Sequence, residues 1–285
     1  MAGGVTWLMT VYAGTAAAHL DAALASLWAQ TRPAAAAVLV ADGPLTAAQE
    51  AVLATHAAAH PELRLIRLPV NRGAGPASAA GLAEVATEWV ARLDADDIAA
   101  PERLARQLPY AEARGLDVAG TALAEFDDAA VAAGASPGRA LLGVRRLPAG
   151  HDRIAAYARW NSPVNHPSAL LRVAAVRAAG GYRDRPMMED YDLWARMLAR
   201  GARFGNMAEP LTLFRGGDAA LARRVGAGMV AAERRMQATL VAEGLVSRPR
   251  AALNLLLRTG YRLLPAAALR RVNRLLFHRR RGAAT

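Results

Sequence analysis

Apolar and polar positions follow two different periods along the first hundred residues. Short runs rich in Val, Leu and Trp occur at Val5–Val11, Ala36–Ala41, Leu63–Leu68 and Trp89–Leu93. Segments with helical spacing separate them, at His19–Gln30, Ala47–Ala59 and Ala77–Thr87. Buried strands that alternate with helices of this length indicate βαβ units and a parallel sheet. We therefore predict an α/β fold in which ligands bind beyond the carboxyl ends of the strands.

The pattern becomes less regular after residue 116. Strands are expected at Asp117–Ala124 and Pro167–Arg172, and helices at His151–Trp160 and Glu189–Arg200. The stretch Phe126–Gly150 is rich in Gly, Ala and Pro and is predicted to be a long loop. The last expected elements are a long helix at Ala219–Glu243 and a pair of Arg- and Leu-rich helices at 248–278, around Pro265.

The first apolar segment, Val5–Val11, is followed by small residues, as in a secretory signal. No basic side chain precedes it, however, and a signal peptide needs a positively charged start. We therefore expect a buried first strand there. No uncharged apolar run approaches about 18 residues, so a transmembrane helix is not expected.

Charge divides the chain unevenly. All 35 basic residues are arginine, and ten of them lie after Glu243, where no acidic residue occurs. The other 25 arginines face 24 acidic residues, so the net charge of +11 comes almost wholly from the C-terminal segment. We therefore expect no nucleic-acid partner for the body of the protein. The absence of cysteine excludes disulfides and thiolate metal sites.

The C-terminal segment mixes leucines with arginines from residue 248 to residue 281. Such a helix can lie in the headgroup plane of an anionic membrane, which makes a membrane surface a candidate partner. Two alternatives stay open: an Arg-rich helix that packs on the domain, and an RNA-binding tail, which the scarcity of aromatic side chains disfavours. The expected location is the cytoplasm, with peripheral attachment to the inner face of the plasma membrane as an option.

Polar residues follow the predicted strands, and the carboxyl ends of parallel strands meet at one edge of a sheet. Thr10 and Tyr12 end the first strand, and Asp42 follows the second. The third is followed by Asn71–Gly75, a glycine-rich basic loop that carries Arg72. This loop could approach a phosphate or serve only as a helix-entry turn.

The fourth strand ends in three aspartates, Asp94, Asp96 and Asp97. Asp94 and Asp96 project to the same side, because side chains alternate along a strand, and neighbouring carboxylates repel each other. Mn²⁺ or Mg²⁺ would resolve this conflict, since these cations take carboxylate and phosphate oxygens. The alternative is an acidic turn that caps the next helix through Asp97.

A second acidic group, Glu189 and Asp190, begins the predicted helix Glu189–Arg200 beside two methionines. A carboxylate in an apolar rim is a competent general base. Asp192, in the same first turn, is interpreted as a partner of the helix dipole only.

Five ordered segments carry a resemblance to a known family. They are VTWLMTVYAG, VLVADGPLT, RLDADDIAAPERL, NSPVNHPSALL and MMEDYDLWARMLARG. Together they resemble family 2 glycosyltransferases of the GT-A fold, over about Val5 to Arg215. The DGPLT and EDYDLW segments resemble the branch that builds bacterial exopolysaccharide and O-antigen repeat units, including amylovoran-type enzymes. The resemblance implies a mixed, mainly parallel Rossmann-like sheet flanked by helices over 1–215, and a helical, Arg-rich extension over 216–285.

The resemblance also implies a donor site. Thr10 and Tyr12 match the strand end that lines the uridine side, and Asp42 matches the aspartate that contacts the base. Many relatives carry two aspartates there, whereas this chain has Ala41 in the first place. Arg72 is a candidate for the nucleotide-sugar side. His166, in the NHPS segment, matches a histidine near the diphosphate or the acceptor, and a purely structural histidine is the alternative.

The two acidic motifs receive separate roles by resemblance. Asp96 is the expected direct ligand of Mn²⁺ or Mg²⁺, with Asp94 nearer the ribose or a metal-bound water. Asp190 matches the general base, and Glu189 supports it.

The implied reaction is metal-dependent and inverting. It would move one sugar from a UDP-, GDP- or dTDP-sugar to a hydroxyl of a glycan or lipid-linked acceptor in surface polysaccharide synthesis. One sugar per reaction is expected because the QxxRW signature of processive synthases is missing. The alternatives are a catalytically silent membrane-associated scaffold and a sugar nucleotidyltransferase. The second would carry a basic, glycine-rich triphosphate loop after the first strand, where this chain has VYAGTAAAH.

Overall fold

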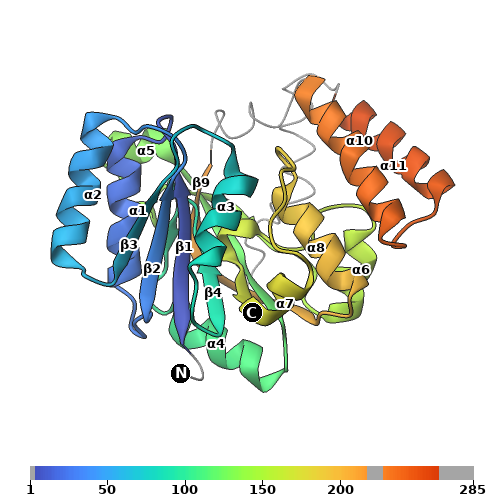
Figure 1. Ribbon diagram of the computed structural model, residues 1–285, viewed down its shortest axis with the longest axis horizontal. Helices are drawn as coiled ribbons and strands as arrows, with labels where there is room; N and C mark the ends of the chain where they lie inside the picture. Colours follow the sequence, from blue (N-terminus) through green and yellow to red (C-terminus); the bar gives the residue numbers. More distant parts are fainter. Residues whose placement is uncertain (1–3, 217–226, 263–285) are drawn as a thin grey trace.

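The computed structural model describes residues 4–216 and 227–262 (Figure 1). Its first half alternates strands and helices as predicted. The strands are β1 (Val5–Val11), β2 (Ala36–Ala41), β3 (Leu63–Arg67) and β4 (Trp89–Arg92). The helices between them are α1 (Ala17–Trp28), α2 (Ala47–Ala59) and α3 (Ala74–Ala83). Helix α3 begins earlier than predicted because Gly73, at φ 88°, supplies the left-handed residue that starts it.

The second half contains more structure than its sequence pattern indicated. The elements near their predicted places are β6 (Val118–Asp127), α6 (His151–Ala158), β8 (Leu170–Arg172) and α8 (Glu189–Ala199). The helix expected after the acidic turn is α4 (Arg103–Ala113). The additional elements are β5 (Ile98–Ala99), the 3₁₀ turn η1 (His166–Ser168), α7 (Val173–Ala178) and β9 (Phe204–Gly216). The prediction of a long loop at Phe126–Gly150 is wrong, since α5 (Asp128–Ala132) and β7 (Leu141–Arg145) lie inside it. Strand β7 pairs with β6 but leaves two leucines exposed, so its sequence shows no buried face.

The described strands form one nine-stranded mixed sheet in the order β3-β2-β1-β4-β8-β6-β9-β5, with β7 on β6. Strands β3, β2, β1 and β4 run parallel, whereas β8 is antiparallel to both β4 and β6. The expected α/β fold with a mixed sheet between helices is therefore confirmed. The chain reverses its direction of strand addition between β1 and β4, and such switch points are where open α/β sheets bind ligands.

Two apolar layers cover the sheet. Helices α1 and α4 pack on one face, where Trp7 and Trp89 are fully buried. Helices α3, α7 and α8 cover the other face, where Trp194 is buried among them. Complete burial of such a side chain contributes about 1.5–3 kcal/mol, so these layers hold the strand ends in fixed positions.

The C-terminal helices α10 (Ala227–Ala242) and α11 (Arg248–Arg262) lie side by side next to α8 (Figure 1). Met236 and Leu240 of α10 pack on Tyr191 of α8. The described part of α11 packs on this assembly, because Arg258 donates to the buried Glu233 of α10, at 2.6 and 2.7 Å. The predicted helix over 219–243 is confirmed from residue 227 onward, and the expected helix after Pro265 lies outside the described residues.

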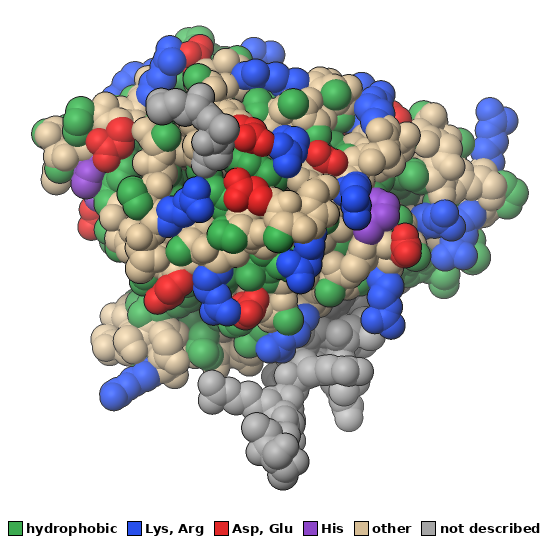
Figure 2. All heavy atoms as spheres, turned by 90° about the horizontal axis from the view of Figure 1, so that it is seen from below, with side chains coloured by type: hydrophobic (Ala, Val, Ile, Leu, Met, Phe, Trp, Pro, Cys, Tyr) green, Lys and Arg blue, Asp and Glu red, His purple; other side chains and the backbone are tan. Residues whose placement is uncertain are grey.

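On the face shown in Figure 2, basic and acidic side chains are interspersed over the described residues. No helix among residues 4–216 and 227–262 combines the length and hydropathy that a membrane span requires.

Candidate active site

The carboxyl ends of β1 and β2 place three predicted residues at one edge of the sheet. Val11 of β1 pairs with Ala41 of β2, so Tyr12 and Asp42 follow at adjacent positions. Thr10 is half-buried, and the Tyr12 side chain is 46% exposed. Gln49 of α2 fixes this edge by donating to the carbonyl of Tyr12, at 2.9 Å. The structure thus presents an exposed aromatic ring above a rigid strand end.

Asp42 is almost fully buried, and both its oxygens are engaged. They accept from the backbone amides of Arg72, at 2.7 Å, and Gly73, at 2.9 Å. The carboxylate therefore ties the loop after β3 to the end of β2. Gly73 also begins α3, so the loop is a helix-entry turn. The Arg72 side chain is exposed at the same edge.

The aspartates after β4 divide into two kinds. Asp94 and Asp96 are partly exposed, whereas Asp97 is 1% exposed. Asp97 accepts from the backbone amide of Arg215, at 2.9 Å, and so anchors the end of β9. Glu102, not Asp97, precedes α4 at its N-cap, and it makes no side-chain cap. Burial, followed by the charges of Asp94 and Asp96, raises the pKa of Asp97 well above its usual range.

The turn after β4 suits a divalent cation that is completed by a substrate. No group of three or more histidine, aspartate and glutamate side chains that could hold a metal occurs in the part of the chain that the structure describes. Asp94 and Asp96 offer two carboxylates on one turn, and Mg²⁺ commonly takes one or two carboxylates plus substrate phosphates. Three carboxyl groups crowd this turn, and positive charge beside them lowers their mutual repulsion. The residues present therefore fit such an ion.

Glu189 and Asp190 begin α8, where the helix dipole favours negative charge. Ser162 Oγ donates to Asp190 Oδ2, at 3.3 Å. Burial, and then the neighbouring Asp190 carboxylate, raise the pKa of Glu189 to about 7, and Asp94 adds to this rise. Asp94 and Glu189 therefore lie near enough for their charges to interact.

Close packing joins α3 to the segment before α8. A Cβ atom added at Gly75 would lie 2.3 Å from the carbonyl oxygen of Arg183 and 3.3 Å from Cβ of Glu189. Only glycine allows this approach, so the loop that carries Arg72 lies near Glu189. At the rim, Met187 adopts φ 70°, a strained conformation for a residue with a side chain.

The interpretation of Asp192 as a dipole partner alone was too narrow. Its side chain is fully buried and pairs with Arg196, at 2.8 Å. Thr239 of α10 donates to its other oxygen, at 3.1 Å. The reason is the C-terminal extension, which covers this side of α8 and could not be foreseen from the helix pattern. Asp192 therefore joins α8 to α10.

His166 is both a structural histidine and a neighbour of the acidic turn. Its Nε2 lies 3.0 Å from Tyr182 Oη, and its Nδ1 lies 3.9 Å from Asp94 Oδ1. Burial, and then the Arg92 guanidinium, hold the pKa of His166 well below its usual range. A neutral imidazole therefore lies beside Asp94.

The structure thus gathers Asp94, His166, Glu189 and Asp190 on one side of the switch point. Thr10, Tyr12, Asp42 and Arg72 lie along the neighbouring strand ends. Sequence reasoning missed three side chains at this site, namely Arg92, Ser162 and Tyr182. An arginine inside the otherwise apolar strand WVAR was the available signal for Arg92.

Comparisons with known proteins support a common origin. The model of glycosyl transferase family 2 matches residues 6–177. The amylovoran biosynthesis glycosyltransferase AmsE of Erwinia amylovora is 33% identical over 263 residues, which cover 92% of this chain and 95% of that protein. The UDP-Gal:alpha-D-GlcNAc-diphosphoundecaprenol beta-1,3-galactosyltransferase of Escherichia coli is 25% identical over 261 residues, 91% of each chain.

Solved structures agree on the fold. S. aureus TarS 1–349 superposes with a TM-score of 0.64 at 14% identity, covering 88% of this chain and 69% of that one. The mannosyltransferase PcManGT from Pyrobaculum calidifontis, in complex with GDP-Man and Mn²⁺, superposes with a TM-score of 0.58 at 18% identity, covering 95% and 79%. The extent of the family match and the near-complete overlap with AmsE settle the assignment: this chain is an enzyme of glycosyl transferase family 2, with the GT-A fold.

Proposed function

We propose that the protein is a metal-dependent inverting glycosyltransferase that adds one sugar to a growing surface polysaccharide. The observation that carries the proposal is that one segment, Asn161–His166, contacts both acidic motifs: His166 Nδ1 lies 3.9 Å from Asp94 Oδ1, and Ser162 Oγ donates to Asp190 Oδ2, at 3.3 Å. A sugar transferred between a diphosphate and a hydroxyl needs both elements: a place for the leaving group and a base for the acceptor.

Each residue has a role in this scheme. Asp190 removes the proton of the acceptor hydroxyl as its oxygen attacks the anomeric carbon from the face opposite the leaving diphosphate. The single displacement inverts that carbon through an oxocarbenium-like transition state. Glu189 supports the base, and Tyr12, Asp42 and Arg72 hold the nucleotide.

Asp96, with Asp94 close by, would hold Mn²⁺ or Mg²⁺. When bound, the ion neutralises charge on the departing diphosphate. Support comes from the crowding of three carboxylates in this turn and from the Mn²⁺ in the PcManGT complex.

Relatives suggest the substrates. The Escherichia coli relative is named for a UDP-Gal donor and a diphosphoundecaprenol-linked acceptor, and TarS has been solved with UDP-GlcNAc. AmsE is named for amylovoran biosynthesis. We therefore assign a nucleotide-diphosphate sugar as donor and a glycan or lipid-linked acceptor of the exopolysaccharide or O-antigen type.

A donor panel tests the proposal. The full chain is incubated with UDP-galactose, UDP-GlcNAc, GDP-mannose and dTDP-glucose, with Mn²⁺, Mg²⁺ or EDTA, and nucleotide release is measured. One donor should be turned over in the presence of metal, and EDTA should abolish release. Release that is equal in EDTA would contradict the metal role. If no donor released nucleotide, either with or without a lipid-diphosphate-linked GlcNAc acceptor, the proposed sugar-transfer reaction would be contradicted.

The C-terminal helices support attachment to an anionic membrane. Helix α11 exposes Leu253 (47%), Leu256 (71%) and Leu257 (50%), which share one helical face at spacings of three and four residues. The Arg-rich residues that follow add the positive charge that anionic lipids attract. Flotation with liposomes that contain anionic lipid should recover the full chain. Equal recovery of a Leu253/Leu256/Leu257→Ser variant would contradict a role for this face.

A further inference from the structure

Two side chains approach the same oxygen of Asp94. Arg92 Nη2 lies 3.6 Å from Asp94 Oδ1, and His166 Nδ1 lies 3.9 Å from it. Both distances exceed a hydrogen bond, so the two groups act on the carboxylate mainly through charge and dipole. Arg92 is 1% exposed and the His166 side chain 11%, while that of Asp94 is 36% exposed. A partly exposed carboxylate therefore rests on two buried partners.

Tyr182 connects those two partners. Its hydroxyl lies 3.0 Å from His166 Nε2, and its ring centre lies 5.9 Å from the guanidinium carbon of Arg92. Arg92, Asp94, His166 and Tyr182 thus form a closed ring of contacts, which we term the Asp94 support. A tyrosine hydroxyl that donates to Nε2 leaves the proton of a neutral imidazole on Nδ1, which is the atom that faces Asp94. In this tautomer, the Nδ1–H group of the His166 imidazole faces the Asp94 carboxylate as a donor.

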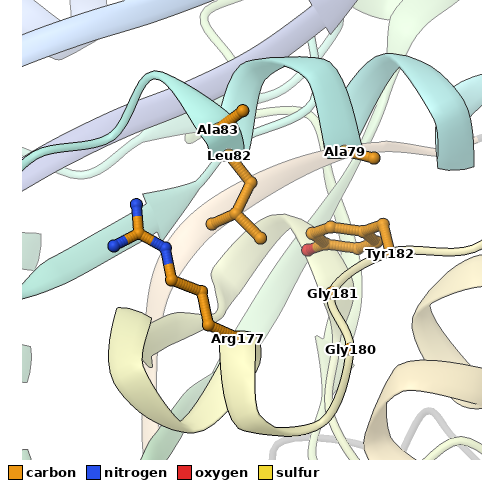
Figure 3. A pocket seen from close by; sticks show the side chains of 7 residues that line it. All are labelled: Ala79, Leu82, Ala83, Arg177, Gly180, Gly181 and Tyr182. Carbon is orange, nitrogen blue, oxygen red and sulfur yellow. The ribbon is translucent and has the colours of Figure 1, made fainter.

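Tyr182 is 5% exposed and packs in the core on this face of the sheet. It lines a cavity of about 280 Å³ between α3 and α7, together with Ala79, Leu82, Arg177 and Gly181 (Figure 3). Leu82 and Tyr182 face each other across this space. The hydrogen bond to His166 therefore fixes the hydroxyl of a side chain whose ring lies at the wall of this cavity.

Arg92, another member of the Asp94 support, has an incompletely hydrogen-bonded guanidinium among the described residues. Its Nε and Nη1 are buried and have no hydrogen-bond partner among the residues that the structure describes. A buried unsatisfied donor costs about 1–3 kcal/mol, and a buried polar group left in this state calls for a functional explanation. Arg103, also fully buried, shows the contrast, because its guanidinium donates to the carbonyls of Pro167 and Arg92, both at 2.8 Å.

We propose that Tyr182 and Arg92 are positioning residues of this enzyme: they orient Asp94 for the donor, Tyr182 through His166 and Arg92 directly. The inference rests on the proposed function, since it assigns how the donor side of that site is held in place. Neither residue touches the reacting atoms. Groups that orient ligands in this way typically affect affinity or activity by about 10- to 100-fold.

A matched pair of hydroxyl deletions tests it. Tyr182→Phe removes the contact to His166, whereas Tyr191→Phe removes an equally buried hydroxyl that donates to the carbonyl of Ala158, at 2.5 Å. With the donor that the panel identifies and Mn²⁺, Tyr182→Phe should raise the KM of the donor about tenfold with a smaller change in kcat. Both variants should lower the thermal midpoint by similar amounts, because each removes one buried hydroxyl. Tyr191→Phe should leave the KM of the donor unchanged. Equal KM values in the two variants would overturn the proposal.

A double-mutant cycle separates a relay from independent contacts. If Tyr182 acts through His166, then His166→Gln and the His166→Gln/Tyr182→Phe double variant should have the same KM for the donor. Additive losses would show that Tyr182 acts on its own and would overturn the relay.

Arg92→Lys, which keeps the charge, should recover part of the donor affinity that Arg92→Met loses. No recovery would exclude Arg92 as a charge partner of Asp94. If the wild-type chain releases nucleotide but these variants keep the donor KM of Tyr191→Phe, the positioning role is overturned. The proposed function is then unaffected.

Discussion

Arg92 and Arg196 are both buried beside an aspartate, but their partners differ in kind. Arg196 donates through all three of its nitrogens: to Asp192, at 2.8 Å, to the carbonyl of Gly181, at 2.7 Å, and to that of Ala179. Arg92 reaches Asp94 only at 3.6 Å, and within the described part of the chain its Nε and Nη1 have no hydrogen-bond partner. The Arg196–Asp192 pair is complete, whereas the Asp94 support is not.

The difference separates architecture from chemistry. A buried pair with every polar atom satisfied holds its surroundings in one arrangement, and losing one member leaves a stranded charge. A polar group that stays unsatisfied in the folded protein is retained at a cost in stability, and such costs concentrate at functional sites. Substitutions at the first pair should therefore change stability, and substitutions around the second should change catalysis.

Asp190→Asn should give the largest effect. Loss of the general base is expected to cut turnover by roughly 10²–10⁴-fold, with little change in the affinity for the donor. Steady-state kinetics and calorimetric titration of the donor with Mn²⁺ measure the two quantities. Wild-type turnover in this variant would show that Asp190 is not the general base. The distinction between a structural region and a catalytic region would then lose its main support.

Asp192→Asn should lower the free energy of unfolding by about 3–5 kcal/mol, because it leaves Arg196 buried without its counter-charge. Urea unfolding measures the loss, and turnover of the folded fraction at low temperature should fall far less than in Asp190→Asn. A variant that keeps its stability but loses turnover would place this pair in the catalytic region.

Glu189→Gln should flatten part of the pH dependence of stability. The folded pKa of Glu189 is raised to about 7 from an ordinary 4.5, so the unfolded chain ionises first as the pH rises. The free energy of unfolding therefore declines between these values, and glutamine at this position removes that contribution. Urea unfolding at pH 5 and pH 8 in EDTA should show a smaller decline for the variant, and identical declines would contradict burial of the acid.

Thr46→Ala should have the smallest effect and serves as a reference outside both regions. Thr46 and Gln49 form a reciprocal cap at the start of α2. Its loss should cost about 1 kcal/mol, read from urea unfolding, without altering the KM of the donor. A change in that KM would show that the base-side edge, which Gln49 fixes through Tyr12, responds to the cap.

The regular half of the fold was open to prediction because β1, β2 and β4 are buried on both faces and helices separate them at regular intervals. Strand β9 was not foreseen, because Pro210 interrupts its pattern. The structure accommodates this proline opposite Ala122, where the β6–β9 ladder shifts register, so that an interior hydrogen bond is not required of it. Strand β7 was hidden by its exposed leucines.

Sequence reasoning found the acidic residues of the candidate site and missed the side chains that support them. Asp94 and Asp190 can be recognised in the sequence because they belong to clusters of acidic residues at the ends of predicted elements. Tyr182 follows two glycines and reads as an ordinary buried aromatic residue, and Arg92 reads as the end of a strand. Their relation to Asp94 depends on the turn after α7 lying beside β4, a tertiary contact that no local period encodes.

The seam between α8 and α10 has a consequence for how such proteins can evolve. Met188, Tyr191 and Ala195, on the helix that carries Asp190, are shielded by Met229 and Met236 of the C-terminal helices. A gene ending near residue 215 would bare this patch beside the base, and bare apolar patches invite self-association. Recombination between relatives should therefore exchange the two segments together, or repair the seam when it exchanges one.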